Sequence, residues 1–306
     1  MLADSALRSE KLSGRGSDSA PVSISGAGMG LRTPHLPTIL NQQPDVAWFE
    51  ILSDNWLQPR RVERQMLDAV VERYPLVMHG VGLSLGGQDP LDLDYLRRIQ
   101  QLKASVNAQW VSEHCSFSQH QGIYVPDLLP LPFTDEAVMH ISERIRTVQD
   151  VFGESILLEN VSSYVDCQFS HLSEAQFMAS IAAESGCDLL LDVNNCYVSA
   201  INATAPDERD EAVLTSYVLD YFDTIPNDRV RQIHLAGHEQ RDGYVLDTHG
   251  GPVCDAVWRL YEAYVTQYGN PPCMIEWDNN VPSFEVVFAE HQLIESVMSR
   301  ATQGAV

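Results

Sequence analysis

The stretch QIHLAGHEQRDGYVLDTHGG, residues 232–251, joins the end of an apolar run to a cluster of side chains that bind transition metals. The run ends at His234, His238 follows four residues later, and a polar, glycine-containing loop leads to Asp247 and His249. Imidazole and carboxylate groups ligate first-row transition metals. The D-x-H spacing places Asp247 and His249 on the same side of an extended segment. Three histidines and one aspartate within sixteen residues indicate a metal site.

Short apolar runs like the one before His234 recur along the chain, separated by longer amphipathic stretches. The runs predict parallel strands covered on both faces, and their ranges are 22–27, 46–52, 76–81, 109–114, 155–160, 188–193, 230–235 and 273–277. Apolar residues at three- and four-residue spacing predict helices over 92–103, 135–152, 173–184, 212–222, 254–268 and 283–298. The connection after the first strand is shorter and carries Pro34 and Pro37, so a helix is doubtful there. Strands alternating with helices predict an α/β fold, a single-domain (β/α)8 TIM barrel, with a doubly wound open sheet as the alternative.

The carboxyl ends of the predicted strands carry most of the candidate ligands. Six of the eight strands place one at or next to that end: His79, His114, Glu159, Asp192, His234 and Glu276. Barrel enzymes build their active sites at this face from different strand ends. A carboxylate that closes an apolar run is costly to bury unless it is paired or metal-bound. Several such carboxylates on one rim would repel each other without a cation, so the pattern favours a site with more than one metal.

The remaining polar residues of these segments have less defined roles. Either Glu113 or His114 could point inward, and we take His114 as the ligand and Glu113 as a partner that orients an imidazole. His238 is a substrate contact or a loop residue, and Asn160, next to Glu159, joins Glu113 and His238 as a candidate catalytic residue. Asn194 and Asn195 could form a turn or supply a weak ligand. We interpret the other histidines as structural or solvated: His35, His120, His140, His171 and His291.

The bulk composition limits the partners and the compartment. The 19 basic and 42 acidic residues give a net charge of −23, which disfavours a nucleic-acid partner. No apolar run approaches the ~20 residues that a membrane span needs. The six scattered cysteines, with no C-x-x-C pair, fit a reducing cytoplasm. We expect residues 1–20 to form a flexible tail and residues 21–306 the catalytic barrel domain.

Several longer segments resemble one enzyme family over roughly residues 20 to 295. They are GAGMGLR (26–32), FEILSDNW (49–56), HGVGLSLG (79–86), SEHCSF (112–117), LLENVSSY (157–164), LLDVNNCYVSA (191–200), IHLAGH (233–238), DTHGGPV (247–253) and IEWDNNVPSF (275–284). The family is that of the multinuclear non-heme iron-dependent oxidative enzymes, which includes the iron enzyme of methanobactin biosynthesis. The resemblance implies a xylose-isomerase-like TIM barrel.

The resemblance also implies cofactors, a substrate and a partner. It implies two or three iron ions, in mixed Fe(II) and Fe(III) states, that use O2 to oxidise a cysteine or the neighbouring backbone of a ribosomally made precursor peptide. The product would be a heterocycle or a rearranged carbon skeleton. A small partner protein would bind the leader of the peptide. A substrate thiolate would bind an iron with an open position, and a neighbouring Fe(III) would act as a Lewis acid.

The layout also looks like that of the trinuclear zinc apurinic-site endonucleases, and this likeness implies three ligand sets. His79, His114 and Glu159 would hold one metal, and Glu159 would bridge to a second held by Asp192, His234 and Glu276. Asp247 and His249 would hold the third, with Asn195 where the endonucleases place a histidine. That departure weakens the third site. Ser53-Asp54-Asn55 also replaces the family's usual Ser-Glu-Asn, and its carboxylate is shorter by one methylene.

Other functions remain open on the same barrel. A donor set of imidazole and oxygen without thiolate suits iron, manganese or zinc equally, so a metal-dependent phosphodiesterase or a sugar isomerase is the alternative. An isomerase needs an inward base, and the only lysines are Lys11 and Lys103. A metal-storage protein would not need so many ligands on separate strands.

Overall fold

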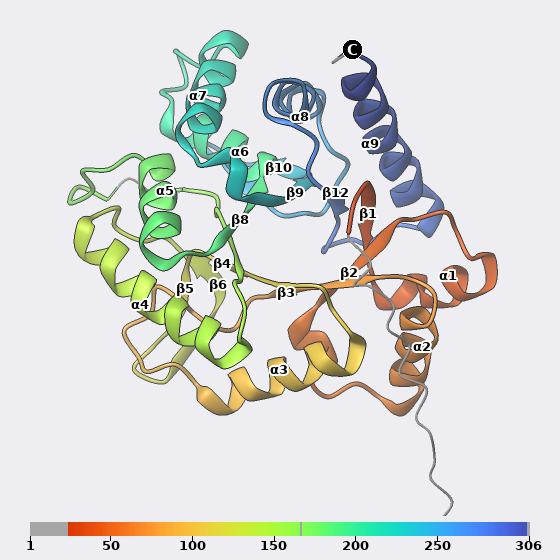
Figure 1. The fold of residues 1–306 in the computed structure, drawn as a ribbon. Helices are drawn as coiled ribbons and strands as arrows, with labels where there is room; N and C mark the ends of the chain where they lie inside the picture. The colour runs from red at the N-terminus through yellow and green to blue at the C-terminus, as the bar shows by residue number, and fades with distance from the viewer. Residues whose placement is uncertain (1–23, 166, 305–306) are drawn as a thin grey trace, which may run out of the picture.

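The computed structural model describes residues 24–165 and 167–304, in which eight parallel strands close into a barrel. The strand order around the barrel is β1-β12-β9-β8-β7-β4-β3-β2. The predicted single-domain TIM barrel is confirmed (Figure 1). The tail expected over residues 1–20 lies outside the described residues. The strands are β1 (Ala27–Gly30), β2 (Trp48–Leu52), β3 (Leu76–Gly80), β4 (Val111–His114), β7 (Leu157–Glu159), β8 (Asp188–Asp192), β9 (Val230–Ala236) and β12 (Cys273–Glu276).

Helices surround the ring of strands (Figure 1). Those predicted from periodicity agree with the structure to within a few residues, apart from the longer C-terminal helix: α3 (Leu93–Val106), α4 (Asp135–Phe152), α5 (Glu174–Ser185), α7 (Glu211–Thr224), α8 (Asp255–Tyr268) and α9 (Phe284–Gly304). The connection with two prolines does form a helix, α1 (Leu36–Gln42), after a 3-10 turn over Thr33–His35. Each proline stands in the first turn of its helix, where no backbone N–H is needed. The connection between β2 and β3 holds α2 (Arg61–Val71). No described helix is both long and apolar enough to cross a membrane.

The prediction for the first strand is wrong in position. The strand is AGMG at Ala27–Gly30 rather than residues 22–27. A Cβ built on Gly28 would lie 2.4 Å from the Trp48 indole, and one on Gly30 would lie 2.7 Å from the Arg32 guanidinium. The glycines give these two large side chains their space inside the barrel. A strand that is half glycine has too few apolar side chains to be recognised as an apolar run in the sequence.

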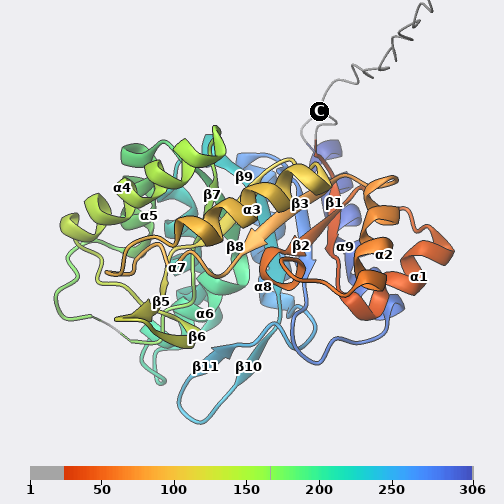
Figure 2. The same ribbon diagram turned by 90° about the horizontal axis from the view of Figure 1, so that it is seen from below.

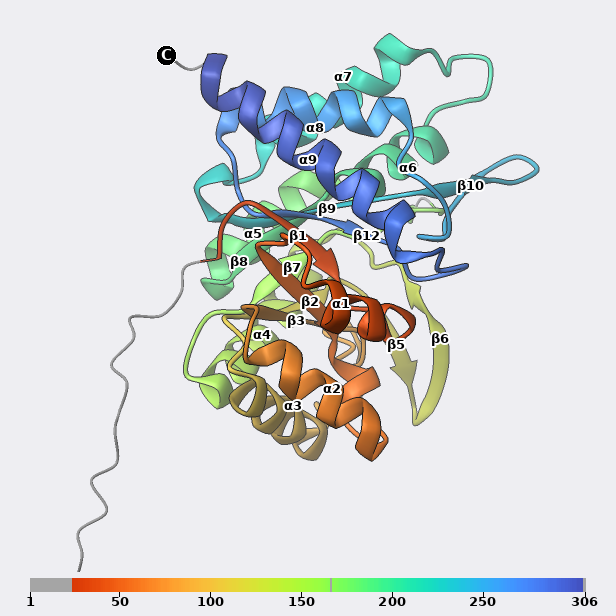
Figure 3. The ribbon, with the colours of Figure 1, turned by 90° about the vertical axis from the view of Figure 1, so that its right-hand side faces the viewer.

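Two hairpins, α2 and one further helix were not predicted. The hairpins pair β5 (Phe117–His120) with β6 (Ile123–Leu129) and β10 (His238–Gln240) with β11 (Val245–Asp247). Figures 2 and 3 show both hairpins on one face of the barrel, with the C-terminal end of α9 toward the opposite face. The helix α6 (Val193–Ala203) begins directly after β8, and its N-cap Asp192 accepts a hydrogen bond of 2.7 Å from the Asn195 backbone. A capping aspartate of this kind ends the strand and starts the helix.

Side chains alternate strictly between the two faces of the barrel wall. Outward residues such as Ile51, Met78, Leu158, Leu191 and Ile275 join the large core beneath the helices. Inward residues near the amino ends of the strands form a second apolar cluster of Ile24, Trp48, Val77 and Met274, against which Trp110 packs. The inward positions at the carboxyl ends are polar. The barrel is therefore closed at one end by apolar side chains and polar at the other, with the hairpins on the polar face.

Strand register brings the strand-end residues of neighbouring strands together. His114 pairs with Glu159 across β4 and β7, and Asp192 pairs with His234 across β8 and β9. Paired residues of adjacent strands share a face of the sheet. The pattern of inward residues thus places the six predicted strand-end ligands on one rim.

Candidate metal centre

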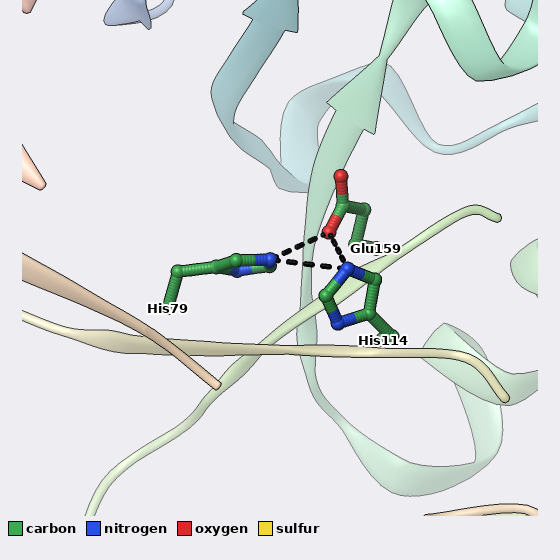
Figure 4. A group of neighbouring side chains, drawn as sticks. All are labelled: His79, His114 and Glu159. Carbon is green, nitrogen blue, oxygen red and sulfur yellow. Dashed lines mark hydrogen bonds and ion pairs between the residues drawn. The ribbon is translucent and has the colours of Figure 1, made fainter. Parts of the chain in front are cut away.

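The first group of side chains consists of His79, His114 and Glu159, all buried (Figure 4). His79 Nε2 lies 3.1 Å and His114 Nε2 lies 3.2 Å from Glu159 Oε2, and the two nitrogens are 3.2 Å apart. Atoms bound to one ion at ~2.1 Å lie roughly 3 Å from each other. The triangle of Figure 4 therefore has the dimensions of a ligand set.

Hydrogen bonds on the far side of each imidazole fix which nitrogen faces the group. The Ser112 hydroxyl donates to the Met78 carbonyl, 3.2 Å away, so it accepts from His79 Nδ1 at 2.7 Å. His114 Nδ1 lies 2.9 Å from the Gly80 carbonyl, which can only accept. Both Nδ1 atoms therefore carry the proton, and both Nε2 lone pairs point at Glu159. This is the arrangement that metal-binding histidines use.

The second group shares Glu159 and adds Asp192, His234 and Glu276, again all buried. His234 Nδ1 lies 2.9 Å from Glu276 Oε2 and 3.4 Å from Glu159 Oε1. Glu159 thus turns one oxygen toward each group. This geometry is that of a bridging carboxylate.

A polar layer lies beneath His234. Its Nε2 atom is 3.2 Å from Glu50 Oε2 and 2.7 Å from the amide nitrogen of Gln232. Gln232 donates to Glu50 at 2.6 Å, and its amide oxygen accepts from Trp110 at 2.7 Å. Glu50 is fully buried. Trp110 orients the Gln232 amide so that its N–H group can donate to His234 Nε2, which places the His234 proton on Nδ1, beside Glu276. Ligation through Nδ1 would require that proton to move to Nε2, where Glu50 is the carboxylate positioned to accept it.

Buried polar atoms without hydrogen bonds test whether the two groups fit a metal. Within the described residues, both Glu159 oxygens, Asp192 Oδ2, His234 Nδ1 and Glu276 Oε2 are buried and have no hydrogen-bond partner. Buried polar groups of native proteins are almost always bonded. No described cysteine joins either group. These orphan atoms converge on the spaces between the ligand sets, so the residues fit resident cations with nitrogen and oxygen ligands.

A third group lies at the edge of the rim and contains His249, Glu276 and Asp278. His249 Nδ1 is 3.4 Å from Glu276 Oε2 and 3.6 Å from Asp278 Oδ2, and its Nε2 is 2.8 Å from Asp247 Oδ1. His249 has a left-handed φ of 45°, and its carbonyl accepts from the backbones of Asp278 and Asn279. A Cβ on Gly237 would lie 2.2 Å from the carbonyl oxygen of Gly251. The backbones of these two residues can therefore approach this closely only because residue 237 is glycine.

Arg32 supplies positive charge to the edge of this group. Its guanidinium pairs with Asp278, lies 3.8 Å from Glu276 Oε1 and donates to the Trp277 carbonyl at 3.2 Å. Burial opposes the charge on Arg32, but Asp278 and Glu276 raise its pKa. Arg32 therefore holds Asp278 and limits the repulsion between rim carboxylates.

The buried charges of the rim depend on one another. Burial opposes ionisation of Glu159, yet His114 and His79 hold its pKa below the usual range. Burial likewise lowers the pKa of His114, but Glu159 and Glu113 outweigh it and raise that pKa to about 9. Burial raises the pKa of Asp192 well above its usual value. Without a metal, imidazolium protons balance the carboxylates.

Besides Asp247, which lies against His249 Nε2 on the other side of the imidazole from Glu276 and Asp278, the structure places four predicted site residues outside these groups. Asn195 donates to the Asn160 carbonyl at 3.0 Å and accepts from Ser162 at 2.8 Å, so its amide is already occupied. Asn160 clamps Asp192 by bonding both its backbone N–H and its carbonyl. Glu113 lies behind His114, with Oε1 at 3.7 Å from Nδ1 and Oε2 accepting from Leu83. Asn160 and Glu113 therefore support ligands rather than face the rim.

His238, the fourth, lies beside the third group. Asn194 donates to Asp247 Oδ1 at 2.9 Å, so its amide oxygen faces His238 Nδ1 at 2.7 Å. That contact places the proton on Nδ1 and leaves the Nε2 lone pair free. Burial lowers the pKa of His238. Burial therefore favours a neutral imidazole at this position.

Sequence reasoning missed Glu50 and Asp278 as members of the site, and it chose Asn195 where the structure places Asn194. Glu50 stands inside the apolar run WFEIL, and this charge was the available signal. Asp278 follows Glu276 by two residues, the same spacing that united Asp247 with His249. Nothing in the sequence separated Asn194 from Asn195. The other histidines were interpreted as structural or solvated, and His35 and His291 are buried and lie within hydrogen-bonding distance of the carbonyls of Pro282 and Gly28.

The closed ring of eight parallel strands is a TIM barrel, and several solved structures have a similar fold. Endonuclease IV from Thermus thermophilus superposes with a TM-score of 0.56 at 15% identity, covering 90% of this chain and 99% of that one. A D-tagatose 3-epimerase-like protein gives a TM-score of 0.56 at 11% identity, covering 92% and 100%. These likenesses concern the fold alone.

Sequence comparison then gives the family. A model of the RiPP precursor modification enzyme family MbnB/TglH/ChrH matches residues 26–299, and the chain belongs to this family, whose members modify ribosomally made precursor peptides. A UPF0276 protein of Acaryochloris marina is 41% identical over 279 residues, which are 91% of this chain and 97% of the relative. Another, from Anaeromyxobacter, is 42% identical over 257 residues, covering 84% and 87%.

Proposed function

We propose that this protein uses two or three iron ions and O2 to oxidise a cysteine of a ribosomally made precursor peptide. The product would be a heterocycle or a rearranged carbon skeleton, and O2 would accept the electrons and protons that the peptide loses. A small partner protein that binds the leader would deliver the peptide. The observation that carries the proposal is Glu159, whose two unpartnered oxygens face two separate ligand groups.

The first two groups supply the proposed ligands, and a third metal would depend on weaker ones. His79, His114 and Glu159 would hold one ion, and Glu159, Asp192, His234 and Glu276 the next. Asp247 and His249 are the proposed ligands at the third position, where Asp278 is the carboxylate that the structure adds. Asn195 makes other bonds, so an amide ligand there would come from Asn194 instead.

The protein's own groups have distinct tasks around the ions. When bound, iron would supply redox chemistry with O2 and a Lewis-acidic position for a substrate thiolate. His238 would accept a proton from the substrate at its free Nε2 atom. Arg32 would hold Asp278 and keep the net charge of the rim in balance. Ser112 and the Gly80 carbonyl would keep His79 and His114 in the tautomers that ligation needs.

Metal analysis tests this proposal directly. The protein would be purified without oxygen from iron-supplemented cells, analysed for metals and examined by Mössbauer spectroscopy. We expect two or more irons per chain with an exchange-coupled, mixed-valent component. Co-expression with a cysteine-containing peptide encoded beside this gene should then change the mass of that peptide only in air.

The same measurement addresses the alternative, a metal-dependent hydrolase or isomerase on the same barrel. Stoichiometric zinc, with no iron site after reconstitution, would replace the oxidative proposal with the hydrolytic one. An isomerase of this type needs an inward lysine or a histidine base. Lys103, the only lysine among the described residues, pairs with Glu154 on the helical exterior, so only a histidine such as His238 could serve.

Glu50 gives a prediction about metal affinity. Changing Glu50 to Gln should weaken iron binding by ~10–100-fold, because the charge that orients and polarises His234 is removed. Competition with a chelator under anoxic conditions measures the affinity. Glu72→Gln, an exposed change at the end of α2, is the control. An affinity equal to that of the wild type in Glu50→Gln would show that Glu50 does not act through His234.

A further inference from the structure

A cavity of about 460 Å³ lies apart from the metal centre, behind the rim. It is formed by the loop between β7 and α5, the start of α5, the C-terminal half of α6 and the residues that follow β6. Its lining mixes apolar and polar side chains, and its main lining residues are Leu131, Phe133, Tyr164, Glu174, Ser199 and Asn202. None of the described residues that line it is a lysine or an arginine.

Glu174 is the unusual member of this lining. It is 8% exposed, and its Oε1 atom is buried with no hydrogen-bond partner among the described residues. Burial raises the pKa of Glu174 to about 8, against a lowering by the Ser199 hydroxyl. A buried carboxyl without a cation destabilises the fold. Glu174 therefore lines the cavity with a carboxyl group whose Oε1 atom, buried beneath the surface, lacks a hydrogen bond.

The cavity wall is bonded to the strand that leads into the metal centre. Asn202 makes two hydrogen bonds of 2.9 Å with the backbone of Val245 at the start of β11. The Tyr164 hydroxyl accepts from the backbone of Asp247 at the end of that strand, 3.1 Å away. A molecule held in the cavity would lie one layer of side chains from the third ligand group.

We propose that this cavity binds a lysine or arginine side chain of the precursor peptide, with the cationic head on Glu174. The identity of the ligand as a precursor peptide rests on the proposed function, whereas the cationic character of the ligand does not. Leu131, Phe133 and Tyr164 offer apolar walls for the methylene stem, as long basic side chains require. The ammonium or guanidinium group supplies the missing partner of Glu174.

Charge and exposure around the cavity agree with a basic peptide as the ligand. The chain has a net charge of −23, which attracts cationic segments. Glu174 is the first residue of α5, where the positive end of the helix favours the ionised carboxylate that a cation needs. Val165 and Phe169, on the loop that bounds the cavity, are 69% and 72% exposed. These two side chains offer apolar surface beside the cavity to an incoming peptide.

Binding of small amides to the full-length protein tests the inference without metal or turnover. Nα-acetyl-arginine amide and Nα-acetyl-lysine amide would be titrated and followed by amide NMR shifts, with Nα-acetyl-norleucine amide as the neutral probe. We expect saturable binding of the cationic amides that Glu174→Gln weakens by at least about tenfold. Glu184→Gln, at the exposed end of the same helix, should leave it unchanged. Equal binding of the norleucine amide, equal affinity in Glu174→Gln, or no binding of either cation would overturn the inference.

A stability measurement checks that the Glu174 variant is folded and that the carboxyl is strained. The folded protein keeps the proton up to a pKa of about 8, whereas a free glutamate loses it near 4.5. The wild type should therefore lose stability relative to Glu174→Gln as pH rises from 4.5 through 8. Cys115, Cys196 and Tyr221 lie near enough to interact with the charge of Glu174, and burial raises their pKa values, so they stay neutral. The other titratable residues that line the cavity are Tyr164, Cys167, His171 and Tyr217. A variant that melts no higher than the wild type at pH 8.5 would contradict the premise.

The two proposals can fail separately. If the protein binds the cationic amides but contains zinc and oxidises no peptide, the inference about the cavity stands and the proposed oxidative function is wrong. If the protein contains coupled irons and oxidises a peptide but shows no Glu174-dependent binding, the proposed function stands and this inference is wrong.

Discussion

Changing Glu159 to Gln should remove the shared metal and reduce peptide oxidation by on the order of 10²-fold or more. Each Glu159 oxygen faces a different ligand group, at 3.1 Å from His79 Nε2 and 3.4 Å from His234 Nδ1. An amide offers one neutral oxygen and one nitrogen that does not ligate, so only one ion could keep its contact. The iron content should fall by at least one ion per chain, and the exchange coupling should vanish from the Mössbauer spectrum.

Glu262→Gln is the matched control for this substitution. Glu262 lies on α8, where its exposed side chain pairs with Arg300, and it belongs to none of the ligand groups. That variant should keep both the irons and the activity. Full iron content with normal turnover in Glu159→Gln would show that Glu159 does not bridge.

Removing the metals should lower the melting temperature of the protein by on the order of 10 °C. Glu159, Asp192 and Glu276 converge in a buried rim, and each has a buried oxygen without a hydrogen bond. A cation that binds only the folded state adds its binding free energy to the stability. Calorimetry before and after anoxic dialysis against a chelator measures the shift.

A ligand variant separates this effect from general damage by the chelator. His234→Ala should melt lower than the wild type with metal present and should shift much less on chelation. Re-addition of iron should restore the wild-type melting temperature but not that of the variant. An identical melting temperature with and without chelator would mean that the rim carries its charges without resident cations.

The sequence predicted the barrel and its rim because charge is conspicuous at the end of an apolar run. Glu159 after ILL and Asp192 after LLL stand out, and register then places them near His114 and His234. The family resemblance supplied the grouping of these ligands, which spacing alone does not give. The same argument did not identify Glu50, because Glu50 lies in the middle of β2, two residues before the strand ends.

Other features depend on contacts that no local pattern contains. The strand AGMG has almost no side chains, and its place is set by Trp48 and Arg32, which fill the space its glycines leave. The choice between Asn194 and Asn195 depends on the start of α6 immediately after Asp192. In an extended segment the two amides would point in opposite directions, but nothing local says which direction faces the rim. The helical turn sends Asn194 to Asp247 and Asn195 to Ser162.

The second apolar cluster, which contains Trp48, Val77 and Met274, limits how molecules can reach the rim. It fills the amino-end half of the barrel, and Trp110 and Gln232 cover it from above. Nothing can pass through such a packed interior, so the rim is both entrance and exit. If O2 and a precursor peptide react at this rim, as proposed, both must enter from the same side of the barrel. O2 would then have to bind before the peptide or diffuse past it, and the product would have to leave before the next turnover.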